Sequence, residues 1–148
     1  MVSNILFLPD LKVFNTVNNA AKNGEKSIAL DLFKACLIHS IDTQERLIYI
    51  SPEMRNILID KNLIPKTIKR LSLYQMISVH TENVSGDYQT SLIRLASILS
   101  IDTNSKIYII CDDVDTRNKM NETAKFFTCI SSETALELVK NMPKNKPS

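Results

Sequence analysis

Three short segments of the sequence are almost continuously apolar, and they constrain the fold more than any other feature. They are Asn4–Leu8, Arg46–Ile50 and Lys106–Ile110. Runs of this length and hydrophobicity are typical of parallel strands, which are buried on both faces of a sheet. A fourth run, Phe127–Ile130, also predicts a strand. The sequence therefore predicts a buried, largely parallel sheet.

Longer segments with the apolar spacing of helices separate these strands. One stripe comprises Ile28, Leu32, Cys36 and His39, and another comprises Leu92, Leu95, Ala96 and Leu99. Helix starts are indicated at Ser51-Pro52 and at Ser131, and a helix stop at Gly24. The expected element order is β-α-α-β-α-α-α-β-α-β-α. It predicts a three-layer α/β/α sandwich around a central, mostly parallel sheet of four or five strands.

Length and composition are those of an ordinary globular domain. The chain has 148 residues, 44% of them hydrophobic and 23% charged. We expect one domain over residues 1–142 and a C-terminal tail over 143–148. Its formal net charge of +2 gives no argument for nucleic-acid binding. No apolar stretch approaches the roughly 18 residues of a membrane span, and the N-terminus does not resemble a signal peptide.

Several classes of site are disfavoured by the residues present. The only glycines are Gly24 and Gly86, so neither a phosphate-binding P-loop nor a dinucleotide fingerprint can be built. His39 and His80 are the only histidines, and neither accompanies a nucleophile motif. The three cysteines form no CxxC pair and lie in apolar surroundings. We therefore expect buried free thiols in a reducing compartment, and a cytoplasmic protein.

Acidic residues follow the ends of the predicted strands. Asp10 follows the first strand, Glu53 the second, and Asp112 and Asp113 the third, while Asp87 opens a later helix. The carboxyl ends of parallel strands meet at one edge of a sheet, so these carboxylates are expected to gather there. Carboxylates without histidine or cysteine suit Mg²⁺ or Mn²⁺, which activate water for attack on a phosphodiester.

The same acids also fit helix capping. Asp112 and Asp115 have the spacing of a capping pair, and Glu53 is a favourable first-turn acid. Asp87 follows Gly86 as an N-cap does, and Asp10 follows Pro9 as a turn residue does. The spacing alone leaves both interpretations open.

From the first strand to Leu138 the chain resembles the PIN domain, the fold of many metal-dependent ribonucleases. The similar stretches are Phe7–Phe14, Tyr49–Leu58, Asp87–Ala96 and Ile109–Asp115, the last being the best match. The resemblance implies that Asp10, Asp87 and Asp113 hold Mg²⁺ or Mn²⁺, with Glu53 and Asp112 assisting. The glutamate of the family's second-strand helix is replaced by Ile57, and the hydroxyl residue after the first acid by Leu11.

The resemblance implies an endoribonuclease that hydrolyses RNA phosphodiester bonds, either a toxin or an RNA-processing enzyme. It also implies an antitoxin or other protein partner, and a homodimer. Lys12, Lys66, Lys69 and Arg70 are the expected RNA contacts. Because an isoleucine binds no metal, Ile57 supports an alternative: a degenerate PIN fold that serves as an RNA-binding or protein-interaction module. A receiver-like regulatory domain fits less well, since its acids would crowd the end of the first strand.

Overall fold

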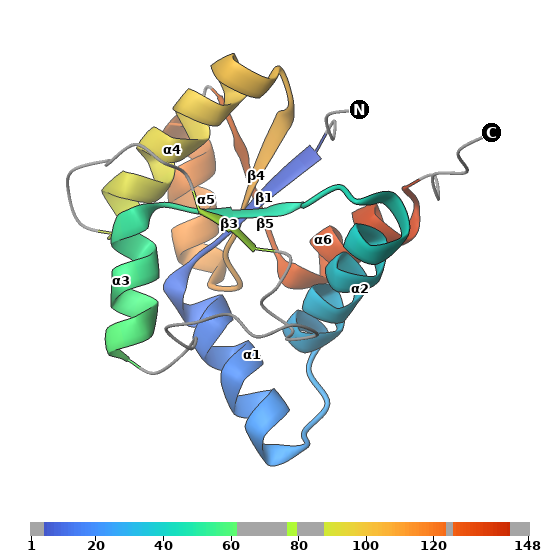
Figure 1. The fold of residues 1–148 in the computed structure, drawn as a ribbon. Coiled ribbons are helices and arrows are strands. Elements are labelled where there is room, and N and C mark those ends of the chain that lie inside the picture. The colour runs from blue at the N-terminus through green and yellow to red at the C-terminus, as the bar shows by residue number, and fades with distance from the viewer. Residues whose placement is uncertain (1–4, 62–76, 80–87, 124–125, 143–148) are drawn as a thin grey trace.

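The computed structural model describes residues 5–61, 77–79, 88–123 and 126–142 (Figure 1). The described residues form five strands and six helices. In chain order these are β1 (Ile5–Pro9), α1 (Leu11–Asn23), α2 (Ile28–Thr43), β2 (Ile48–Ile50), α3 (Pro52–Asp60), β3 (Ile77–Val79), α4 (Tyr88–Thr103), β4 (Lys106–Ile110), α5 (Val114–Thr123), β5 (Thr128–Ile130) and α6 (Ser132–Lys140). The predicted tail, residues 143–148, lies outside the described residues, as does the segment 62–76.

The strands form one parallel sheet with the order β3-β2-β1-β4-β5. Its centre is the β1–β4 pair, in which Leu8 lies beside Ile109. The predicted α/β fold with a parallel sheet is thereby confirmed. The sequence did not predict β3, because Ile77–Val79 is only three residues long and two of its side chains are only partly buried. So short a segment has no run of apolar residues to detect.

Helices cover both faces of the sheet. Figure 1 shows α2 and α6 packed together on one side, with α4 and α5 on the other. The central strands are buried on both faces, as their continuous hydrophobicity predicted, and Phe7, Leu8 and Ile109 are fully buried. In the α1–α2 contact, the rings of Phe14 and Phe33 meet edge to face with centroids 5.3 Å apart. This geometry favours aromatic pairs because the positive ring edge meets the negative ring face.

The two predicted helix stripes are largely buried. All four members of the α4 stripe are buried, from Leu92 to Leu99. In α2, Leu32, Cys36 and His39 are buried, whereas Ile28 is exposed, contrary to its predicted place in the stripe. Ile28 is the first residue of α2, directly after the N-cap Ser27. All three cysteines are buried free thiols, as predicted.

Local signals fix the helix ends where the sequence indicated them. Gly24 ends α1 with φ 67° and donates its N–H to the Ala20 carbonyl, a left-handed conformation that glycine adopts without a Cβ penalty. The Ser51 hydroxyl caps α3 by accepting the Met54 N–H at 3.0 Å. The Ser131 hydroxyl caps α6 by accepting the Thr134 N–H at 3.2 Å. These caps satisfy amides that have no partner within their helices.

An asparagine side chain covers the outer edge of the sheet at β5. The Cys129 N–H donates to Asn121 Oδ1 at 2.7 Å, and Asn121 Nδ2 donates to the Cys129 carbonyl at 2.9 Å. The Asn121 amide thus takes the place of a neighbouring strand. It satisfies backbone groups that would otherwise be available for pairing with another chain.

In the described part of the chain, the longest helices, α2 and α4, have 16 residues. None of the described helices has the length and hydropathy that a bilayer crossing requires.

Candidate functional site: the carboxyl edge of the sheet

The direction of strand placement reverses at the centre of the sheet. From β1 the chain adds β2 and β3 on one side, and then β4 and β5 on the other. In open parallel sheets, the crevice at such a reversal lies at the carboxyl ends of the strands and is the usual ligand site. Here Asp10 follows β1, and the segment Cys111–Asp113 follows β4. Three of the predicted acids therefore flank the reversal point.

Asp10 is the N-cap of α1 and is partly buried. Its Oδ1 accepts the Val13 N–H at 2.9 Å. Burial raises the pKa of this carboxyl above its usual value, and the negative charge of Asp112 adds to the rise. The Val13 amide, a hydrogen bond from the Cys111 thiol and the positive charge of Lys12 oppose it. The net rise means that the charged form of Asp10 is held at a free-energy cost.

Asp113 opens α5 and lies at the surface. Its Oδ2 accepts the Thr116 N–H at 2.9 Å and a hydrogen bond from the Thr116 hydroxyl. These bonds, with smaller contributions from the positive charges of Lys12 and Arg117, lower the pKa of the Asp113 carboxyl. The prediction that Asp112 and Asp115 form the capping pair is therefore wrong, because Asp113 provides the cap. No hydrogen bond to Asp113 Oδ1 comes from the described residues.

Asp112 links the end of β4 to the start of α6. Its Oδ1 accepts the Ser132 N–H and its Oδ2 accepts the Ser132 hydroxyl, both at 2.7 Å. Because Ser132 is buried, this contact places the first turn of α6 beside the carboxyl edge. A cavity of about 290 Å³ adjoins the contact and is lined by Thr16, Ser27, Ile28, Ala29, Asp112, Ser131, Ser132 and Glu133. Both carboxylate oxygens of Asp112 are thus already engaged by protein donors.

Two basic side chains flank the acids. Lys12 is exposed on the first turn of α1 and interacts electrostatically with both Asp10 and Asp113. Arg117 is half-buried on α5, and its Nη1 donates to the Cys111 carbonyl at 2.9 Å. Arg117 is not among the site residues that the sequence predicts. Its spacing of four residues from Asp113, which places both on one helical face, is the signal that could have identified it.

Glu53 follows β2, in the first turn of α3, and is half-buried. Neighbouring strands lie about 4.8 Å apart, so the end of β2 is one strand from Asp10 and two strands, roughly 10 Å, from Asp113. Ile57 is half-buried one turn further along α3. The remaining predicted site residues, Asp87 and the RNA contacts Lys66, Lys69 and Arg70, lie outside the described residues.

The described part of the chain contains no group of three or more histidine, cysteine, aspartate or glutamate side chains arranged to hold a metal ion. Asp10 and Asp113 flank the reversal point, and in each of them one carboxylate oxygen accepts a backbone amide while the other does not. They supply the hard oxygen donors that Mg²⁺ and Mn²⁺ prefer. A complete ligand set therefore requires at least one further donor, such as Asp87.

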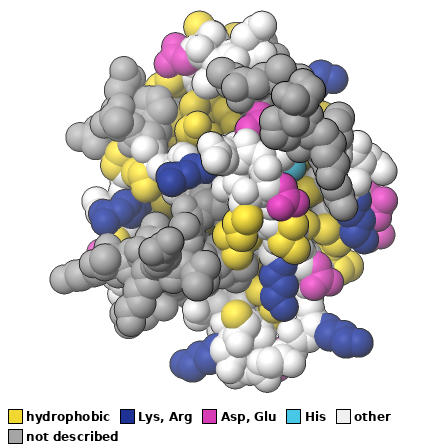
Figure 2. Space-filling view, turned by 45° about the vertical axis from the view of Figure 1, so that its right-hand side comes forward, with side chains coloured by type: hydrophobic (Ala, Val, Ile, Leu, Met, Phe, Trp, Pro, Cys, Tyr) yellow, Lys and Arg dark blue, Asp and Glu magenta, His cyan; other side chains and the backbone are white. Residues whose placement is uncertain are grey.

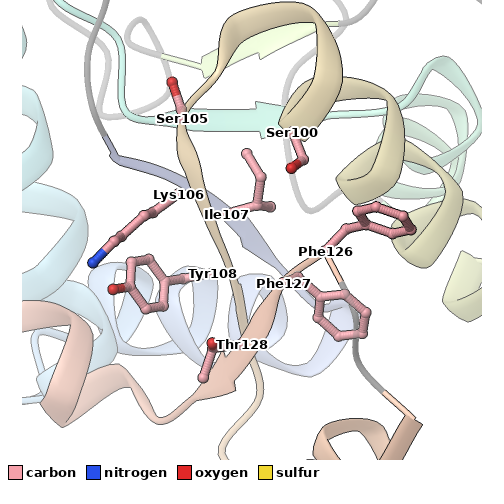
Figure 3. A pocket seen from close by; sticks show the side chains of 8 residues that line it. All are labelled: Ser100, Ser105, Lys106, Ile107, Tyr108, Phe126, Phe127 and Thr128. Atoms are coloured by element: carbon pink, nitrogen blue, oxygen red, sulfur yellow. The ribbon is translucent and has the colours of Figure 1, made fainter.

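A larger cavity, of about 350 Å³, lies at the opposite, amino-terminal edge of the sheet. Figure 3 shows Lys106 and Tyr108 on one side of β4, and Ile107, Phe126 and Phe127 on the other. These residues belong to the starts of β4 and β5, whereas the acids follow the strand ends. This cavity is therefore separate from the acidic site.

Comparisons of the chain with protein-family models, with curated proteins and with solved structures give no match.

Proposed function

We propose that the carboxyl edge of the sheet binds a divalent cation, Mg²⁺ or Mn²⁺, and hydrolyses RNA phosphodiester bonds, as the PIN-like sequence pattern implies. The supporting observation is that Asp10 and Asp113 flank the strand reversal and that Lys12 interacts electrostatically with each of them. Asp87, which lies outside the described residues, is the further metal ligand that the PIN-like pattern implies. Glu53 assists from the neighbouring strand end, and Asp112 by positioning α6.

The residues fit such a cation by charge and by donor type. Burial and the nearby Asp112 raise the pKa of Asp10, so the site holds negative charge at a cost. A divalent cation removes that cost because it compensates the carboxylates directly. When bound, it supplies Lewis-acid activation of the phosphodiester and of the attacking water.

The chain's own basic residues have a separate role in this proposal. Lys12 and Arg117 flank Asp113 and attract the RNA phosphate to the carboxylates. Arg117 is anchored through one nitrogen by the Cys111 carbonyl, which leaves its other N–H groups available to an anion. The lysine and arginine thus provide the positive charge that a polyanionic substrate requires beside an acidic site.

The first experiment measures cation binding by thermal unfolding with and without millimolar Mn²⁺. At a concentration of about 100 times its dissociation constant, a ligand of the folded state adds about 2.7 kcal/mol of stability. We expect the melting temperature of the wild type to rise and that of Asp113→Asn not to. Asparagine caps helices as well as aspartate does, so this change removes the charge and keeps the cap. Asp115→Asn removes the same charge on the same helix and should respond to Mn²⁺ as the wild type does.

The second experiment measures cleavage of single-stranded RNA with Mn²⁺ and with EDTA. Cleavage that EDTA and Asp113→Asn both abolish is the expected result. An absence of both Mn²⁺ stabilisation and cleavage would overturn the proposal.

A second candidate is a degenerate PIN fold that binds RNA or protein without hydrolysis. It is favoured by Ile57, which occupies the family's glutamate position on α3, and by the use of Asp112 and Asp113 as hydrogen-bond acceptors for helix starts. RNA binding without cleavage, unchanged by EDTA, would support this candidate over the nuclease.

A further inference from the structure

Three sulfur atoms from different elements meet beside the end of β4. Cys129 Sγ lies 3.8 Å from the Sδ of Met120, and the Cys129 thiol also forms a side-chain hydrogen bond with the thiol of Cys111. Cys111 follows β4, whereas Met120 belongs to α5 and Cys129 to β5. Both thiols are buried and Met120 is half-buried. These residues (Cys111, Met120 and Cys129) form a sulfur triad, in which Cys129 contacts both of the others.

Hydrogen bonds hold the backbone around the sulfur triad in place. The Asn121 side chain bonds both the N–H and the carbonyl of Cys129, and the residue before it in α5 is the methionine of the triad. The Cys111 N–H donates to the Ile130 carbonyl at 2.9 Å, and Arg117 Nη1 donates to the Cys111 carbonyl at 2.9 Å. The elements that carry the three sulfur atoms are thus fixed to one another, as in a binding site that is formed before its ligand arrives.

The spacing and the donor type fit a soft metal ion. Metal–sulfur bonds are about 2.3 Å long, so three sulfur ligands in a trigonal plane lie about 4 Å apart. The 3.8 Å between Cys129 and Met120 is close to that separation. Among the described residues, no third histidine, cysteine, aspartate or glutamate joins the two thiols in a metal-binding arrangement. Zn²⁺, which takes four ligands, is therefore disfavoured, and thiolate with thioether is a donor set that selects Cu(I).

The surroundings of the sulfur triad can compensate the charge of such an ion. Two thiolates and one Cu(I) carry a single net negative charge, and metal binding releases the thiol protons. The positive charge of Arg117 favours the thiolate form of Cys129. The Cys111 thiol donates a hydrogen bond to the Asp10 carboxylate. Asp10 is therefore placed to accept the Cys111 proton as the metal–sulfur bond forms.

The same thiols are poorly suited to a disulfide switch. Burial raises the pKa of Cys111 to about 11 and that of Cys129 to about 12. Thiol oxidation and exchange proceed through the thiolate, so both groups are inert without a metal. A soft cation does not need a thiolate formed beforehand, because its own affinity for sulfur displaces the proton.

We propose that the sulfur triad binds one Cu(I) ion, with Cys111 and Cys129 as thiolate ligands and Met120 as a thioether ligand. Its sulfur donors differ from the carboxylate donors of the Mg²⁺ or Mn²⁺ site proposed above. The two proposals are therefore tested separately, and Asp113→Asn should bind Cu(I) as the wild type does.

The test is an anaerobic titration of the full chain with Cu(I), in competition with a chromophoric Cu(I) chelator. We expect one Cu(I) per chain and an ultraviolet thiolate-to-copper charge-transfer band. Cys111→Ala and Cys129→Ala should each weaken binding by more than the roughly 10–100-fold that loss of an outer-shell partner costs.

Cys36→Ala is the matched control, because it removes a fully buried thiol outside the sulfur triad. Cys36 belongs to α2, which lies on the opposite side of the sheet from α5 (Figure 1). The face of the molecule that carries α2 has hydrophobic side chains among acidic and basic ones (Figure 2). Cys36→Ala should bind Cu(I) as the wild type does.

Met120→Leu separates ligation from packing. Leucine conserves the volume and the hydrophobicity of methionine, so the fold should tolerate this change. We expect Cu(I) affinity to fall by at least about 10-fold, and X-ray absorption to count two sulfur neighbours of copper in place of three. A wild type that takes no Cu(I) from the chelator would overturn the proposal. So would Cu(I) binding that Cys129→Ala leaves intact, or that Cys36→Ala weakens as much as Cys129→Ala does.

Discussion

The side chain of Asn121 holds the edge strand β5 through two hydrogen bonds. It accepts from the Cys129 N–H and donates to the Cys129 carbonyl, at 2.7 and 2.9 Å. Cys129 is buried in the edge strand, so truncation to alanine leaves both backbone groups without these partners. Each hydrogen bond contributes about 1 kcal/mol net, and more where the abandoned group stays dry. Alanine returns up to about 0.7 kcal/mol through its higher helix propensity. We expect Asn121→Ala to destabilise the fold by about 2 kcal/mol, within the 1–3 kcal/mol range of such losses.

The assay is urea unfolding at equilibrium, with thermal unfolding as a second measure. A loss of about 2 kcal/mol corresponds to a fall in melting temperature of roughly 4–8 °C in a domain of this size. Asn118→Ala is the matched control, because Asn118 lies exposed on the same helix and makes the same gain in propensity. Hydrogen exchange should also accelerate at the Cys129 amide in Asn121→Ala. If the two variants differ in stability by less than about 0.5 kcal/mol, the account of the β5 edge is wrong.

Three further predictions concern the carboxyl edge and the helix ends. Asp112→Ala removes both acceptors of the buried Ser132 and should destabilise the fold by about 2 kcal/mol in urea unfolding, whereas Asp115→Ala should have little effect. The folded-state pKa of Asp10 lies above the ordinary 3.8, so the folded protein keeps this proton at pH values where the unfolded chain has lost it. Asp10 therefore lowers the free energy of unfolding increasingly as pH rises through that window. Asp10→Asn should be more stable than the wild type at pH 7 and should lose that advantage below pH 3.8. Urea unfolding at both pH values measures the difference. Gly24→Ala places a Cβ at φ 67° with no compensating contact, and should lower the free energy of unfolding by about 1 kcal/mol.

The strands that the sequence predicts are those whose hydrophobicity is continuous. The Lys106–Ile110 run matches β4 at both ends, and the first run is displaced by one residue from β1. These strands are central and buried on both faces, so nearly every position must be apolar. An edge strand is less completely buried, so fewer of its positions must be apolar. The edge strand β3 was missed, and the other edge strand, β5, is one residue shorter than its predicted run. The interior strand β2 is also shorter than predicted, by two residues, because it begins at Ile48 rather than Arg46.

The candidate site was predictable as far as the sheet determines it. Acids that follow parallel strands must lie at one edge, and Asp10, Glu53 and Asp113 do so. Which acid caps which helix was not predictable, because the choice between Asp112 and Asp113 depends on where α6 packs. Ser132 approaches the end of β4 through a tertiary contact across 20 residues of sequence, and it engages Asp112. Asp113 is then left to cap α5.

The pKa of Asp10 is raised and that of Asp113 is lowered, and this difference tests whether helix capping alone explains the two acids. An N-cap carboxylate that accepts amide hydrogen bonds should have a lowered pKa, and Asp113 follows this rule. Asp10 also accepts an amide hydrogen bond as an N-cap, yet burial and the nearby Asp112 raise its pKa. A serine at position 10 would cap α1 equally well without that cost. The capping interpretation therefore explains Asp113 fully and Asp10 only in part. Raised pKa values of buried carboxyls occur at functional sites, so the raised pKa of Asp10, together with its place at the strand reversal, supports the proposed cation site.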